Sequence, residues 1–119
     1  DKNRIDNSSY YYEHIEIYKN ILLKVKSISN NWSGDIIIVY IPSLELFENK
    51  KYYEVNIKLK DDLFNFWQKE NIRVIDLFKI FKNNQNPSSF FNQEKNLHYK
   101  KETYSLIVNE IIDLIQIDN

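Results

Sequence analysis

The sequence predicts an α/β fold with at least two parallel strands and three helices. Two short runs rich in β-branched and other apolar residues, 35–41 and 72–77, have the composition of buried strands. Apolar residues at helical spacing precede the first run, separate the two runs and continue to the end of the chain. Helices that alternate with strands are typical of parallel sheets whose strands are joined by crossover connections.

The first helix is expected to begin at Ser8 or Ser9 and to end near Ser29. Its apolar positions recur every three or four residues and are Tyr11, Ile15, Tyr18, Leu22 and Val25. Gly34 is the only glycine in the chain and follows this helix, at a place where a left-handed or tight conformation is commonly needed. Residues 1–9 are polar and without a period, so the predicted domain spans residues 10–119.

The middle of the chain has a weaker pattern. Pro42 ends the first strand, because proline cannot donate a hydrogen bond to a strand ladder. Residues 43–51 are predicted to form a loop or a short helical turn, and residues 51–60 an irregular segment or an edge strand. A second helix is expected to begin at Asp61 or Asp62, either of which can cap it, and to end by Asn71.

The C-terminal part combines a second strand, a turn-rich loop and a final helix. Phe90 and Phe91 are expected to anchor the loop on the core, and the helix is predicted to begin at Lys100 or Lys101. Its apolar stripe consists of Tyr104, Ile107, Val108, Ile111, Ile112 and Ile115. Since both strands are apolar on both faces, we expect further strands to flank them, supplied by preceding sequence or by another chain.

Composition excludes several classes of function. The chain has no cysteine, which rules out disulfides, a thiolate zinc site and a cysteine nucleophile. A net charge of -1 gives no general attraction to nucleic acid or to an anionic membrane, and no apolar run approaches the ~20 residues of a membrane span. Two histidines without clustered carboxylates give no sign of a metal site, and no cofactor is expected. The chain starts without Met, which is compatible with a piece of a longer protein.

His98 is the main candidate for chemistry. A neutral imidazole just before a helix can take a proton from a serine hydroxyl if an acid fixes its tautomer. Asp76 at the end of the second strand and Glu94 in the loop are the candidate acids. The alternatives are that His98 is a polar residue covering the last helix and that Asp76 satisfies backbone N–H groups of its loop.

Other polar and aromatic residues have simpler interpretations. His14 is expected on the surface of the first helix. Ser43 follows a strand but lacks the Gly-x-Ser-x-Gly turn that exposes a nucleophile, so a catalytic role is not expected. Trp32 and Trp67 could stack on sugars, although packing is the commoner role of such aromatics. The lysines within 95–101 are predicted to be a solvated loop.

Several segments together resemble a known family. IIIVYIPS, RVIDLF, NPSSFF and LHYKKETYSLIVNEII follow the order and spacing of the C-terminal third of an SGNH hydrolase (GDSL-type esterase) domain, especially in bacterial members. The resemblance covers about residues 10–117, and its most distinctive part is His98-Tyr99 with Glu102-x-Tyr104. It implies part of a three-layer, flavodoxin-like sandwich and hydrolysis or transfer of acyl esters, often on acylated carbohydrate.

The resemblance assigns the general base to His98. Lys95 stands where the family has an aspartate three residues before this histidine, which leaves Glu94 and Asp76 as substitutes. The family's serine block has no counterpart here, so the chain is expected to be inactive alone and to serve a serine elsewhere. Its departures from the family also favour an alternative: a non-catalytic α/β module that binds a partner or a glycan through its Tyr- and Phe-rich surface.

Overall fold

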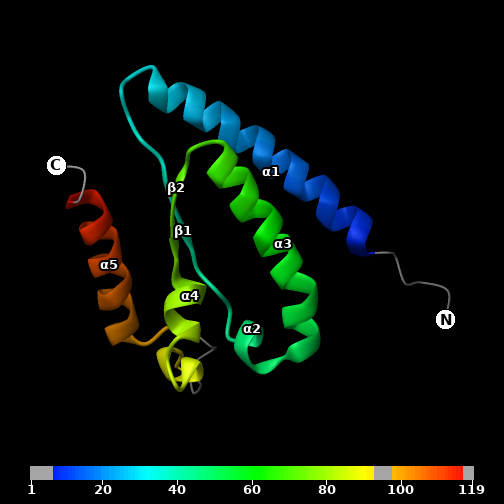
Figure 1. The fold of residues 1–119 in the computed structure, drawn as a ribbon, viewed down its shortest axis with the longest axis vertical. Helices are drawn as coiled ribbons and strands as arrows, with labels where there is room; N and C mark the ends of the chain where they lie inside the picture. Colours follow the sequence, from blue (N-terminus) through cyan, green and yellow to red (C-terminus); the bar gives the residue numbers. More distant parts are fainter. Residues whose placement is uncertain (1–6, 93–97, 117–119) are drawn as a thin grey trace. The chain divides into compact units, whose positions relative to one another are not determined.

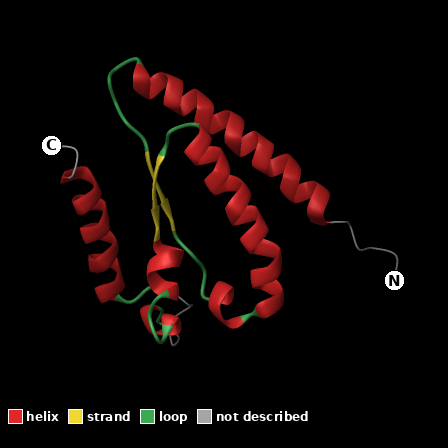
Figure 2. Ribbon diagram, in the orientation of Figure 1, coloured by secondary structure: helices red, strands yellow, loops and turns green. Residues whose placement is uncertain are grey.

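The computed structural model describes residues 7–92 and 98–116, with side chains from residue 12 onward. The chain divides into two compact units, residues 1–36 and residues 37–119. The first contains one long helix, and the second contains the sheet and the remaining helices (Figures 1 and 2). Within the described residues, no helix has the length and apolar character needed to cross a bilayer.

Helix α1 (Asn7–Asn30) occupies most of the first unit, as its apolar spacing predicted. The turn after it closes with a hydrogen bond from Gly34 N to Ser29 O of 2.8 Å. The left-handed conformation expected at Gly34 lies instead at Ser33, whose φ is 56°. Glycine at position 34 lets the backbone pass close to Ser29, because a Cβ at this position would lie 3.3 Å from Ser29 O. The sequence therefore located the turn but not the residue that reverses the chain.

The sheet of the second unit has two parallel strands, β1 (Ile37–Tyr40) and β2 (Arg73–Asp76). Ile37 lies opposite Arg73 and Tyr40 opposite Asp76, so both strands end at the same edge of the sheet. Both predicted strands are present and their parallel direction is confirmed. The chain is thus a mixed α/β protein.

Helices lie on opposite sides of these strands (Figure 1). On one side, α3 (Lys50–Lys69) places the ring of Phe64 5.6 Å from the ring of Tyr40. On the other, α5 (Lys101–Gln116) contributes Ile107 to a core cluster with Ile75 of β2. The strands were expected to be fully covered, but every residue of β1 is only half-buried. The cause is that each strand has one neighbour and therefore one unpaired edge among the described residues.

The prediction for residues 51–60 is wrong, because they belong to α3. This helix begins at Lys50, where the side chain of Asn49 accepts a hydrogen bond of 3.0 Å from Tyr52 N. Asp61 and Asp62, the expected caps, lie inside the helix. The helical period was hidden because a charged residue, Lys60, occupies a core position and is only 8% exposed.

Short helices fill the edge of the sheet at the strands' carboxyl ends. They are α2 (Glu45–Glu48) after β1, α4 (Leu77–Lys82) directly after β2, and the 3-10 turn η1 (Pro87–Phe90). Phe91 follows η1 and is 2% exposed, so it anchors the loop as predicted. The stripe predicted for α5 is only partly buried: Ile107 is 8% exposed, whereas Tyr104 and Val108 are both 51% exposed.

Candidate functional site

A short antiparallel clasp holds His98 in place. Phe91 pairs with Tyr99 in an isolated bridge, flanked by hydrogen bonds from Asn92 N to His98 O of 2.6 Å and from Lys100 N to Phe90 O of 3.0 Å. The clasp, defined as residues 90–92 and 98–100, fixes the backbone from His98 to Lys100. The imidazole itself is exposed.

Tyr99 connects the clasp to the end of β1. Its hydroxyl donates a hydrogen bond to the carbonyl of Pro42, and its ring lies 4.7 Å from that of Phe91. Burial, and to a lesser extent the nearby Tyr104, raises the pKa of Tyr99 well above its ordinary value. The phenol therefore stays a protonated donor at neutral pH, and this contact places His98 beside the loop that follows β1.

A cavity of about 310 Å³, here called the β1-end cavity, lies beyond the carboxyl end of β1. Residues 41–45 form one wall, and Phe91, His98 and Tyr99 form the other. Open α/β sheets bind ligands beyond the carboxyl ends of their strands. The structure thus brings the predicted base to a place where a reacting group can be bound.

Ser43 also lines this cavity, but it does not form a serine–histidine pair. Its Oγ is buried and has no hydrogen-bonding partner. A nucleophile and its base must lie within about 2.6–3.2 Å of each other, and the nucleophile must reach the substrate. An inaccessible hydroxyl meets neither requirement, in keeping with the low expectation for Ser43.

The carboxylate of Asp76 has other partners. Its Oδ2 forms an ion pair of 2.8 Å with Lys60, and its Oδ1 accepts a hydrogen bond of 3.3 Å from Lys79 N at the start of α4. The Lys60 ammonium also lies 3.8 Å from the ring centroid of Phe64. Burial and, secondarily, the charge of Asp76 raise the pKa of Tyr40. These contacts assign Asp76 the N-capping role that was its alternative interpretation.

His98 and Asp76 share no hydrogen bond or ion pair in the described part of the chain. Glu94, the other candidate acid, lies outside the described residues, as does Lys95. The assignment of either acid to His98 therefore stays a prediction.

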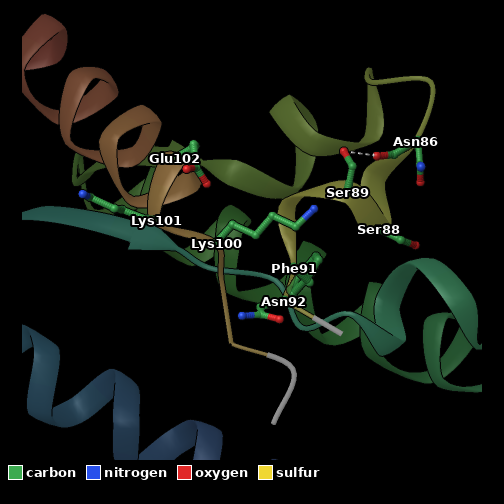
Figure 3. A pocket seen from close by; sticks show the side chains of 8 residues that line it. All are labelled: Asn86, Ser88, Ser89, Phe91, Asn92, Lys100, Lys101 and Glu102. Carbon is green, nitrogen blue, oxygen red and sulfur yellow. Dashed lines mark hydrogen bonds between the residues drawn. The ribbon is translucent and has the colours of Figure 1, made fainter. Parts of the chain in front are cut away.

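A larger cavity of about 630 Å³, here called the α5 cavity, lies at the start of α5 (Figure 3). It is lined by Asn86, Ser88, Ser89, Phe91, Asn92, Lys100, Lys101 and Glu102. Its wall is mostly polar and is contributed by η1, the clasp and the first turn of α5. This cavity could not be predicted from the sequence, because its residues meet only through the clasp.

Thr103 and Tyr99 are structural residues of the site to which sequence reasoning assigned no role. Thr103 is 3% exposed, and its Oγ1 donates a hydrogen bond of 2.7 Å to Phe90 O, which ties α5 to the clasp. It stands where the resembled family commonly has glycine. The one available signal was the position of Tyr99 next to His98.

The described residues contain no group of three or more histidines and carboxylates that could hold a metal ion. Comparison with known proteins gives no relative: no family model, no curated protein and no solved structure matches this chain. The resemblance to SGNH hydrolases accordingly stays a prediction from the residues that carry it.

Proposed function

We propose that this chain is the C-terminal part of an SGNH-like ester hydrolase or acyltransferase domain, in which His98 is the general base for a serine outside the chain. The observation that carries the proposal is the position of His98. Its exposed imidazole lines a cavity beyond the carboxyl end of a parallel strand and has no partner among the described side chains. A free imidazole at such an edge can accept a serine proton.

The arrangement of layers supports the same proposal. With α3 on one side of the strands and α5 on the other, the second unit is compatible with part of a three-layer sandwich of the flavodoxin type. The unpaired edges and half-buried residues of β1 leave room for a further strand. A segment that adds this strand could also deliver the serine to the β1-end cavity, with an acylated carbohydrate or another acyl ester as substrate.

Esterase activity tests this function. The 119-residue chain alone should hydrolyse p-nitrophenyl acetate no faster than buffer, because Ser43, the serine that lines the cavity of His98, is buried and unpaired. Together with the serine-bearing segment, it should gain activity that falls about 10²- to 10⁴-fold in His98→Ala, the usual contribution of a general base. His14→Ala removes the other histidine and is the matched control. Hydrolysis by the chain alone that survives His98→Ala would refute the proposal.

A second function is favoured by the contacts of Asp76. Both carboxylate oxygens of Asp76 have other partners, and no carboxylate of the described residues is hydrogen-bonded to His98. A protein that had lost its acid could keep the fold as a non-catalytic module for a partner or a glycan. In that case no upstream segment confers esterase activity, while ligand binding persists in His98→Ala.

A further inference from the structure

The α5 cavity has a distribution of charge and polarity that points to a ligand class. Lys100, Lys101 and Glu102 line it, and the carboxylate of Glu48 is hydrogen-bonded to Ser88 in its wall. Figure 3 shows Lys100 extending across the cavity toward Ser89, while Glu102 stays on the α5 side. In the described part of the chain, no carboxylate lies within ion-pairing distance of Lys100. An uncompensated ammonium over a cavity attracts an anion.

Two serines line the cavity from the η1 side, and the hydroxyl of Ser88 points away from Lys100 (Figure 3). Ser88 Oγ donates its hydrogen to Glu48 Oε1 at 2.8 Å, and Ser89 Oγ donates to Asn86 O at 2.7 Å. Since a hydroxyl has one hydrogen and two lone pairs, the Ser89 oxygen can still accept from a ligand hydroxyl. The cavity therefore offers an acceptor for an O–H group on one side and a cation on the other.

The size of the cavity suits an occupant larger than a simple ion. This volume lies within the usual range of sites for small organic molecules, roughly 300–1,000 Å³. We infer that the α5 cavity binds a sugar that carries a carboxylate or a phosphate, with Lys100 on the anionic group and Ser89 on a sugar hydroxyl.

Lys100 also stands close to His98. The two residues are separated by Tyr99 in the extended clasp, which puts their Cα atoms about 7 Å apart. Each of them lines a different cavity. A sugar held by Lys100 thus lies near the proposed base. This last step rests on the proposed function, whereas binding in the α5 cavity does not.

Titration of the whole 119-residue chain by ¹H–¹⁵N NMR tests the inference. Glucuronate and glucose 6-phosphate are the two anionic probes, and their relative affinity distinguishes carboxylate from phosphate. At least one of them should shift the amide signals of Ser89, Lys100 and Glu102 with a Kd of about 1 mM. Glucose lacks the anionic group and inorganic phosphate lacks the sugar hydroxyls, so each should bind at least about tenfold more weakly.

Substitutions that change the charge of the cavity should change its affinity for the anionic sugar in a predictable direction. Lys100→Gln should weaken binding about tenfold, and Lys100→Arg, which keeps the charge, should bind within about threefold of the wild type. Glu102→Gln should strengthen binding a few-fold, because it removes a like charge from the cavity. Lys58→Gln removes an exposed lysine of α3 outside the cavity and should change nothing.

Three results would overturn the inference: no shifts with either anionic sugar, equal binding of glucose, or the same Kd in Lys100→Gln as in Lys58→Gln. If inorganic phosphate bound as tightly as glucose 6-phosphate, the cavity would be a phosphate site and the proposed sugar specificity would be refuted. Binding that is lost in Lys100→Gln, together with no esterase activity even when the serine-bearing segment is present, would leave this site in place and refute only the catalytic proposal.

Discussion

The contact between Lys60 and Asp76 gives the sharpest prediction about stability. Asp76→Asn removes the charge that pairs with Lys60, whose side chain is 9% exposed, while that of Asp76 is 18% exposed. Asparagine caps a helix about as well as aspartate, so the hydrogen bond to Lys79 N can persist. The substitution therefore isolates the cost of leaving a buried ammonium without its counter-charge.

The magnitude follows from this burial. Removing one partner of a fully buried ion pair costs about 3–5 kcal/mol. The remaining exposure of Asp76 and the ring of Phe64, 3.8 Å from the ammonium, reduce that cost, so we expect a loss of about 2–3 kcal/mol. Asp76→Ala also removes the cap and should cost about 1 kcal/mol more.

Urea unfolding followed by circular dichroism at 222 nm measures the loss. With a slope of about 1–3 kcal/mol per M, Asp76→Asn should lower the midpoint by roughly 1–2 M. In the double variant Lys60→Met/Asp76→Asn no unpaired charge is left, so its stability should exceed the additive value by about 2 kcal/mol. A cost below about 0.5 kcal/mol, or additive behaviour, would show that this ion pair does not hold α3 to the sheet.

Two further substitutions test other contacts. Tyr99→Phe removes the hydrogen bond to Pro42 O and should cost about 1–2 kcal/mol near pH 7, measured by the same urea assay. The pKa of Tyr99 is higher in the folded state than in the unfolded chain, where it is about 10. This stabilisation is therefore complete below about pH 10 and is lost at higher pH. Between about pH 8 and pH 11, Tyr99→Phe should lose less stability than the wild type does. Ser33→Gly should stabilise the chain by about 0.5–1 kcal/mol in thermal unfolding, because φ is 56° at this residue, and Ser33→Ala should not. A loss of stability in Ser33→Gly would contradict the left-handed turn.

The candidate site shows where prediction from sequence stops. The position of His98 before the last helix is a local fact, and the sequence was sufficient to select it. Its surroundings are not local: Tyr99 reaches Pro42, which lies 57 residues earlier in the chain. The α5 cavity likewise combines residues 86–92 with residues 100–102, which meet because the clasp brings them together.

Local sequence pattern was sufficient to predict α1, both strands and α5. The two helices show apolar residues at helical spacing, and the two strands are short continuous apolar runs. Local pattern failed for the first half of α3, where Lys60 occupies a core position and breaks the apolar period. That position tolerates a lysine only because Asp76, sixteen residues later, provides the opposite charge at the end of β2. The sequence by itself therefore determined α1, both strands, α5 and their order. Tertiary structure decided the extent of α3, which charges are buried and what surrounds His98, since these depend on groups far apart in the chain.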